Sequence, residues 1–464
     1  MVATSIDLSY LSIREASTLF RKGELSPVEL TQYHLKRIEQ FQPSVRAYTT
    51  VTNDIALQEA KAAEAAIRQG DPRPLLGIPV AYKDIYLTEG VRTTAGSAVH
   101  ASWVPGFTAT TVAKLHDAGV VMLGKLATHE FAFGLSTEDH PFPPARNPWN
   151  LDYIPGGSSS GSGAALAAGL AIGTLGTDTG GSIRWPGIAC GIAALKPTYG
   201  RCSRHGVVTL SWSLDHTGPM ARNCEDIAFM LNALAGYDPK DPASASVPTE
   251  DYTAKLTTNL KDVKLGVLRS WYEQASDPEV VAAIDAAIDL LKSLGAEIQV
   301  VEIPNIHLLD VNRVILLSEA YAFHAQNLTE TPELYPDGLR DRLLTGKLFS
   351  AYEYIQAQRA RQILKSEVEA LLKDVDLLIS PTWGTTAITF ENAYQMMMRG
   401  PGVYFTPLYN MTGSPALSVP CGFGSNGMPI GLQIAGRAFD EATVLQVGYA
   451  YEQAAGWFDR RPIL

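Results

Sequence analysis

Cysteine is scarce in this sequence, and histidine shows no metal-binding arrangement. The 464 residues include only 4 Cys, at positions 190, 202, 224 and 421, and no two of them have CxxC spacing. This scatter argues against a disulfide framework and a thiolate zinc site, and it favours a reducing compartment. His129 and Glu130 begin like the HExxH zinc motif, but Phe133 stands where the second histidine is needed. We therefore expect no metal and no other cofactor.

Positive charge is also in short supply. The chain has 37 Lys+Arg against 48 Asp+Glu, a net charge of −11, and no run of basic residues. A negative surface repels phosphate groups, so we expect no nucleic-acid partner and no membrane partner. The longest apolar run, near GAALAAGLAIG, is too short to span a bilayer, and the N-terminus lacks the apolar core of a signal peptide. We expect a cytoplasmic protein, either a monomer or a homodimer.

The patterns along the chain predict an α/β fold. Charged residues make up 18% of the chain, below the roughly 25% of an average globular protein, which favours a large interior over disorder. Residues 1–74 are typical of a helical layer, with cap signals at Ser12 and Glu15 and again at Ser26 and Glu29. Short β-like runs then alternate with Gly-rich turns and helical pieces. The later runs VKLGVLR, DPEVVAAIDAAIDLLKSLGA and EIQVVEIP predict a strand, a helix and a strand.

The segment with the most unusual composition runs from Ile154 to Pro186. It holds nine glycines and five serines in 33 residues. Glycine inside a helix or strand costs roughly 0.5–1 kcal/mol relative to alanine, so packing alone does not explain this composition. Glycines let backbone N–H groups point into a cavity, where such a row of donors binds a phosphate or an oxyanion. We therefore expect the chemistry to lie in this segment.

Three other interpretations of the segment fit less well. A phosphate-binding P-loop needs a lysine directly after its glycines, and none occurs before Lys196. Residues 157–161 match the GxSxG string of α/β-hydrolases, but the strand before them is too short and no suitably placed histidine follows. A flexible Gly/Ser linker would not contain the apolar run AALAAGLAIGTLG.

In order, the sequence contains PVAYKDI, GGSSSGSGAA, GTDTGGSIRWP, CGIAALKPTYG, PLYNMTGSPALSVPCGF and GMPIGLQIAG, which are spread over most of the chain. These motifs resemble those of the amidase signature family of serine hydrolases. The resemblance implies one large α/β/α domain over residues 1–464, with a mixed central β-sheet covered by helices. Within it we expect the helical layer 1–74, a signature core at 75–220, and the rest of the sheet with the substrate pocket at 221–464.

The resemblance also implies a catalytic triad of Ser182 as nucleophile, Ser158 after a cis peptide bond, and Lys83 as base. Serine needs a base, no histidine lies beside the signature, and lysine can serve if burial makes it neutral. The oxyanion hole is expected from the backbone N–H groups of Thr179, Gly180, Gly181 and Ser182. Expected supporting residues are Gly157, Ser159, Asp178 and Arg184. Lys125 is a weaker candidate for the base, and Lys196 is expected to be a surface lysine.

The expected substrate pocket is largely apolar. It comprises Phe131, Phe133, Leu135, Tyr153, Ile183, Trp185, Met398, Tyr404 and Phe405. Aromatic and methionine side chains predict an adaptable apolar wall. The resulting expectation is an amidase that cleaves apolar or aryl amides, and also carbamates (urethanes) and esters, through an acyl-Ser182 intermediate. Its only partner would be the small-molecule amide or carbamate substrate.

An alternative is the glutaminase (A) subunit of a tRNA-dependent amidotransferase, which the same family includes. Arg342 would then hold the glutamine carboxylate, although a charge on a helix surface explains it equally well. The acidic composition and the aromatic pocket candidates favour the free-standing amidase. A binding protein with a vestigial site is disfavoured because Lys83, Ser158 and Ser182 are all present.

Overall fold

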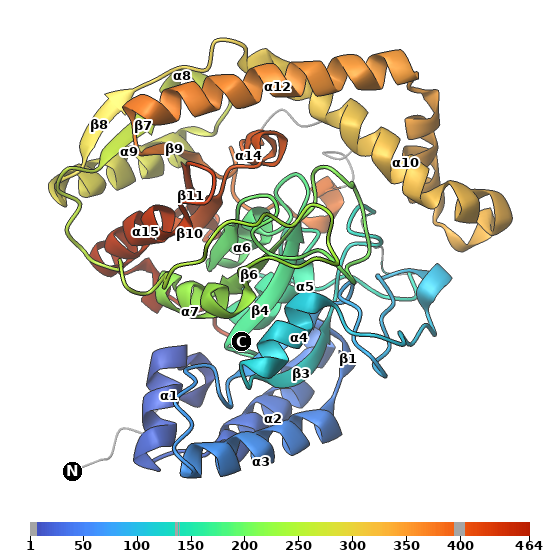
Figure 1. Cartoon of the computed structure of the whole chain (residues 1–464), viewed down its shortest axis with the longest axis vertical. Coiled ribbons are helices and arrows are strands. Elements are labelled where there is room, and N and C mark those ends of the chain that lie inside the picture. The colour runs from blue at the N-terminus through green and yellow to red at the C-terminus, as the bar shows by residue number, and fades with distance from the viewer. Residues whose placement is uncertain (1–6, 135–137, 139, 394–403) are drawn as a thin grey trace.

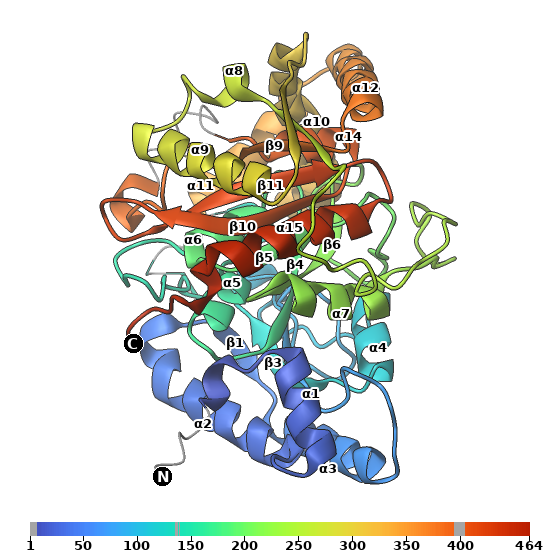
Figure 2. The same ribbon diagram turned by 90° about the vertical axis from the view of Figure 1, so that its left-hand side faces the viewer.

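The computed structural model describes residues 7–134, 138, 140–393 and 404–464. Its strands form one mixed sheet of eleven strands, in the spatial order β1-β3-β2-β4-β6-β5-β10-β11-β9-β7-β8 (Figure 1, Figure 2). The strands are β1 (Tyr48–Val51), β2 (Pro79–Lys83), β3 (Val121–Leu126), β4 (Gly173–Asp178), β5 (Ala193–Lys196), β6 (His216–Ala221), β7 (Lys264–Val267), β8 (Glu297–Val300), β9 (Leu377–Pro381), β10 (Ala416–Phe423) and β11 (Pro429–Gly436).

Helices surround this sheet. They are α1 (Ile13–Lys22), α2 (Pro27–Val45), α3 (Asn53–Arg68), α4 (Thr110–Asp117), α5 (Ser160–Ala167), α6 (Arg184–Cys190), α7 (Cys224–Leu234), α8 (Arg269–Tyr272), α9 (Pro278–Ser293), α10 (Asn312–Glu330), α11 (Asp337–Thr345), α12 (Ala351–Asp374), α14 (Pro407–Thr412) and α15 (Glu441–Ala455). A 3₁₀ turn, η3 (Ile306–Val311), precedes α10. No helix among the described residues is long and apolar enough to cross a membrane.

The two faces of the sheet bury different sets of side chains. Ala193 and Leu195 of β5 belong to the core cluster that includes the residues of α7. Ala194, between them, packs instead with Leu166 of α5 and Cys190 of α6. Because successive side chains of a strand point to opposite faces, α7 and the α5–α6 pair cover opposite sides of the sheet. This layering confirms the predicted single α/β/α domain with a mixed sheet.

The N-terminal helices begin where the cap signals predict. Ser12 and Ser26 each accept a hydrogen bond from the backbone N–H of a glutamate three residues later, and each glutamate carboxylate bonds back. The region is not wholly helical, however, since β1 lies between α2 and α3 and pairs antiparallel with β3. Four residues bounded by two helices carry too short a period-two pattern to be recognised in the sequence.

The later part of the chain contains the predicted strand–helix–strand unit. Strands β7 and β8 are parallel, and α9 connects them. The C-terminal strands β10 and β11 return to the middle of the sheet, where β10 pairs antiparallel with β5. The whole chain therefore shares one sheet, while the finer division at residues 74 and 220 stays a prediction.

The sheet also brings the signature segments to one edge. Strands β2 and β4 are parallel neighbours, so their carboxyl ends lie side by side. Lys83 is the last residue of β2 and Asp178 the last residue of β4. Helices α5 and α6 begin directly after the two serine-bearing turns. Distant parts of the signature thus meet at the carboxyl edge of β2 and β4.

Candidate active site

Lys83 and Ser158 form the centre of the site. The side chain of Lys83 is fully buried, and its Nζ lies 2.7 Å from Ser158 Oγ and 2.8 Å from Thr177 Oγ1. The peptide bond between Gly157 and Ser158 is cis, as the resemblance implied. Ser159 Oγ accepts the backbone N–H of Thr177 and donates to its carbonyl, both at 3.2 Å. The serine turn is therefore fastened to β4 with Ser158 facing the lysine.

Burial makes Lys83 suitable as a base. Loss of hydration lowers the pKa of the Lys83 ammonium to about 7, although the nearby carboxylates of Asp215 and Asp178 oppose this shift. A substantial fraction of Lys83 is then neutral near pH 7 and can accept a proton from Ser158. Lys125, the weaker candidate, instead bonds to Tyr86 O and Thr93 Oγ1 and lies 3.5 Å from Asp84.

The Lys83 pKa predicts the pH dependence of amide hydrolysis. A protonated lysine cannot act as a base, so kcat/KM should rise with pH through about 7 and then level off. We expect roughly tenfold less activity at about pH 6 than above about pH 8, since one pKa unit is a tenfold change in protonation. Initial rates across this range, with fluorescence at each pH to verify the fold, measure the effect. A profile that falls as pH rises would contradict the assignment of Lys83.

Ser182 lies on the turn between β4 and α6, and Asp178 holds that turn. The Asp178 carboxylate accepts the backbone N–H groups of Gly181 at 2.8 Å and Ile183 at 3.2 Å. It also accepts two bonds from the buried Arg184 guanidinium, at 2.8 and 2.9 Å. Burial alone would raise the pKa of Asp178, but Arg184 holds it well below its ordinary value. The expected supporting pair is therefore present, and Ser159 bonds to Thr177 rather than to this pair.

The turn leaves fewer free donors than the sequence suggested. The N–H of Gly181 is engaged by Asp178, whereas those of Gly180 and Ser182 donate to no other atom among the described residues. Gly181 has φ +129°, and an added Cβ would overlap Thr406 Oγ1, so only glycine fits there. Thr406 Oγ1 also donates to Gly180 O at 2.6 Å. The oxyanion hole stays a prediction, with Thr179, Gly180 and Ser182 as its available donors.

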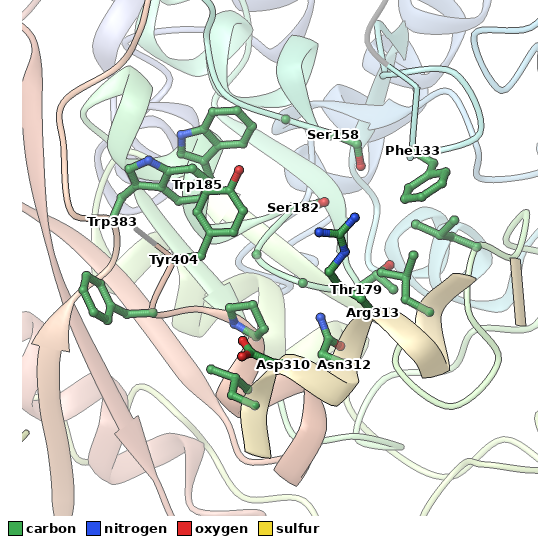
Figure 3. A pocket seen from close by; sticks show the side chains of 18 of the residues that line it. Phe133, Ser158, Thr179, Ser182, Trp185, Asp310, Asn312, Arg313, Trp383 and Tyr404 are labelled. Carbon is green, nitrogen blue, oxygen red and sulfur yellow. The ribbon is translucent and has the colours of Figure 1, made fainter. Parts of the chain in front are cut away.

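A cavity of about 500 Å³ opens over both serines. Of the expected pocket residues, Phe133, Trp185, Tyr404 and Phe405 line it, and Figure 3 shows Ser158 and Ser182 on its wall. Three others lie elsewhere: Phe131 stacks on Tyr335, Ile183 is buried between α5 and β6, and Tyr153 packs near Ala387 and Met428. Leu135 and Met398 lie outside the described residues. Position next to a motif did not reveal which side of the turn a side chain faces.

The cavity also contains residues that sequence reasoning missed. Trp383 stacks on Trp185 with ring centroids 4.5 Å apart and planes within 6°, and Trp271 meets Phe405 edge-on at 5.0 Å. Polar residues from η3 and the start of α10 also line the cavity: Asp310, Asn312 and Arg313 (Figure 3). No motif marks these positions, because they reach the cavity only through the packing of elements far along the chain.

Arg342 lines the cavity and is not simply a charge on the outer surface of its helix. It lies in α11, its Nη1 donates to Phe133 O at 2.9 Å, and its guanidinium lies 3.6 Å from the centre of the Phe133 ring. Burial lowers the pKa of Arg342 to about 10, and Arg313 adds to this shift. Within the described residues Arg342 has no carboxylate partner. A charged, partly buried guanidinium without a counter-ion favours an anionic ligand.

Two further expectations can be compared with the structure. Lys196 is not a surface lysine: it is fully buried and its ammonium donates to Ser414 O at 2.6 Å. The prediction was wrong because Lys196 ends β5, an interior strand that lies between β6 and β10 in the sheet. The described residues contain no group of three His, Cys, Asp or Glu side chains that could hold a metal ion.

Comparison with known proteins identifies the family. The model of the Amidase family matches residues 29–445, so this protein belongs to that family, the amidase signature enzymes. The A subunit of the glutamyl-tRNA(Gln) amidotransferase of Chloroflexus aggregans (strain MD-66 / DSM 9485) is 41% identical, and the match covers 99% of this chain and 99% of the relative.

Solved structures agree with this family. The structure of a vestigial protein complex, described as revealing the origins of an s-triazine catabolic enzyme, is 32% identical with a TM-score of 0.89, covering 98% of this chain and 100% of its own. A bacterial aryl acylamidase is 26% identical with a TM-score of 0.87, covering 98% and 99%. The chain is therefore an enzyme of the family that cleaves carbon–nitrogen bonds.

The relatives overturn one expectation. We expected no nucleic-acid partner and no partner besides a small molecule. This expectation is contradicted by a full-length relative that is one subunit of an amidotransferase named for glutamyl-tRNA(Gln). The net charge of −11 misled us because it sums over the whole surface. One member of a larger assembly can be acidic overall while local patches, or other members, contact the nucleic acid.

Proposed function

We propose that this protein is the glutaminase (A) subunit of a tRNA-dependent amidotransferase, where it releases ammonia from the side-chain amide of glutamine. The observation that carries the proposal is the pair of guanidinium groups, Arg313 and Arg342, in the cavity that holds Ser182. The identity of 41% over the full length of a relative with that name supports it.

The proposed reaction uses the residues at the carboxyl edge of β2 and β4. Neutral Lys83 draws a proton from Ser158, which draws one from Ser182, and Ser182 Oγ attacks the amide carbonyl. Backbone N–H groups of the turn stabilise the oxyanion. The proton returns through Ser158 to the departing nitrogen, which leaves as ammonia, and an ester remains on Ser182. Water then cleaves this acyl-enzyme by the same route.

The charges in the cavity suit an amino acid. A glutamine carboxylate can accept hydrogen bonds from Arg342 or Arg313, and charge-assisted bonds of this kind are the strongest that proteins use for small anions. Asp310, which also lines the cavity, offers a carboxylate to the α-ammonium group. A neutral apolar amide would leave the partly buried Arg342 guanidinium without a counter-charge, which costs free energy, whereas Arg313 remains exposed to water.

A second candidate is a free-standing amidase for aryl or other apolar amides, and for the corresponding carbamates and esters. The aromatic wall favours it: Trp185 and Trp383 stack, and Tyr404 lies 4.0 Å from Trp383 between ring centroids. The likeness to an aryl acylamidase points the same way. Ammonia release from glutamine, benzamide and a phenyl carbamate by the purified chain, alone and with the other components of the amidotransferase, separates the two candidates.

The substitution Arg342→Met tests the role of charge. A lost hydrogen bond to a charged group costs about 1.5–3 kcal/mol, so kcat/KM for glutamine should fall roughly 10- to 100-fold, mainly through KM, while benzamide turnover changes little. Arg340→Met is the matched control, because Arg340 lies on the same helix and pairs with Asp337. Unchanged glutamine turnover in Arg342→Met would contradict the proposed substrate.

A further inference from the structure

His129 lies in the cavity with no role in the reaction described above. It follows β3, and its backbone N–H donates to Ser158 O at 3.1 Å. Its ring packs directly against Gly157, where an added Cβ would overlap three ring atoms of His129. Glycine at position 157 thus allows the imidazole to lie against the peptide that carries Ser158. The ring is one of the cavity walls.

The ring nitrogens of His129 are free to bind a ligand. Among the described residues, neither nitrogen makes a hydrogen bond. Burial, with the charges of Lys83 and Arg342 adding to it, lowers the pKa of His129 to about 3, so the imidazole is neutral in the working range. A neutral imidazole has one N–H donor and one acceptor nitrogen. Polar atoms that face a cavity without a partner in the protein are suited to a polar ligand.

The position of His129 indicates which substrate atom it meets. In the proposed reaction Ser158 hands its proton to the departing nitrogen, so that nitrogen must come within hydrogen-bond distance of Ser158 Oγ. His129 touches the same peptide from the cavity side. A primary amide nitrogen keeps two N–H groups while it is attacked, and one of them can meet the imidazole acceptor.

We propose that His129 accepts a hydrogen bond from the N–H of the scissile amide and thereby makes the enzyme selective for amides over esters of the same acid. This inference rests on the serine–lysine route of the proposed function. It is independent of whether glutamine is the acid, because it concerns only the leaving nitrogen. An ester has no N–H at that place, so the imidazole acceptor gains nothing from it.

The test compares amide and ester turnover in His129→Leu. We expect kcat/KM for amides to fall about tenfold, the effect of losing one hydrogen bond, and kcat/KM for esters to change less than about twofold. The substrate pairs are glutamine with the γ-methyl ester of glutamate, and benzamide with methyl benzoate. His129→Gln, which keeps an acceptor oxygen, should recover part of the amide activity. His116→Leu, on the exposed side of α4, is the control.

The possible outcomes of this test distinguish the role of His129 from the glutaminase proposal. Equal losses for amide and ester, or no loss for either, overturn the role of His129. A wild-type enzyme that cleaves benzamide but does not cleave glutamine, even with the other components of the amidotransferase, overturns the glutaminase proposal, while the second pair still tests His129. A wild-type enzyme that cleaves neither amide overturns both. If His129→Leu does not fold, His129→Phe keeps a flat ring without nitrogens, and its amide-to-ester ratio is the same readout.

Discussion

Replacing Ser182 with alanine is expected to lower kcat/KM for amide hydrolysis by about 10⁴-fold or more. Without the hydroxyl, neither the acyl-enzyme nor its proton relay can form, and only binding and oxyanion stabilisation remain. Ser182 is partly exposed on the cavity wall, so the substitution removes one oxygen and leaves the turn held by Asp178. Initial rates of ammonia release, together with the intact mass of the protein after reaction with a serine-directed acylating reagent, measure the effect.

Ser160→Ala is the matched control for this prediction. Ser160 begins α5 in the same serine-rich segment, but its hydroxyl donates to Ala127 O and does not line the cavity. Its substitution should leave the rate within about threefold of wild type, because it removes only one long hydrogen bond, 3.4 Å, outside the cavity. Full activity in Ser182→Ala, or labelling of another residue by the acylating reagent, would refute the assignment of the nucleophile.

Replacing Lys83 with methionine is the second large effect that we expect, a loss of about 10² to 10⁴ in kcat/KM. Methionine has similar length and no basic nitrogen, so Ser158 loses the base that lies 2.7 Å away. The buried site tolerates an apolar side chain, because the ammonium pays a hydration penalty there that methionine avoids. Thermal melting should therefore show a fold at least as stable as wild type, while the rate of amide hydrolysis collapses.

Lys83→Arg separates base catalysis from mere positive charge. Arginine remains protonated at all working pH values, so it can hold Ser158 by a hydrogen bond but cannot accept its proton. We expect Lys83→Arg to be as inactive as Lys83→Met, whereas substantial activity would mean that charge alone suffices. Lys61→Met, at an exposed position of α3, serves as the control for the loss of one lysine.

Local signals predicted much of the fold. The serine–glutamate caps marked the starts of α1 and α2, and the β7–α9–β8 unit followed from one amphipathic run between two short apolar runs. These features depend on residues within a few positions of each other, where backbone sterics and capping hydrogen bonds act. Strand β1 was not predicted, because its four residues owe their conformation to pairing with β3, far along the chain.

The residues of the candidate site were likewise predicted only in part. The motifs led to Lys83 and Ser158, whose side chains the structure places within hydrogen-bond distance. They failed for Phe131 and Ile183, which lie beside the motifs but turn into the core. They gave no indication that Trp383 and Arg313 line the cavity. A motif shows which residues are near one another along the backbone, but the direction of each side chain depends on how the next layer packs.

By itself, the sequence determined the family, the α/β character and the residues that gather at the carboxyl edge of β2 and β4, since these follow from short segments with strict backbone requirements. Only the tertiary structure decided the character of the cavity. It set the Arg342 guanidinium against Phe133 and the His129 ring against Gly157. Such contacts depend on how the whole core packs. A local sequence pattern therefore does not show which distant segments will lie against each other.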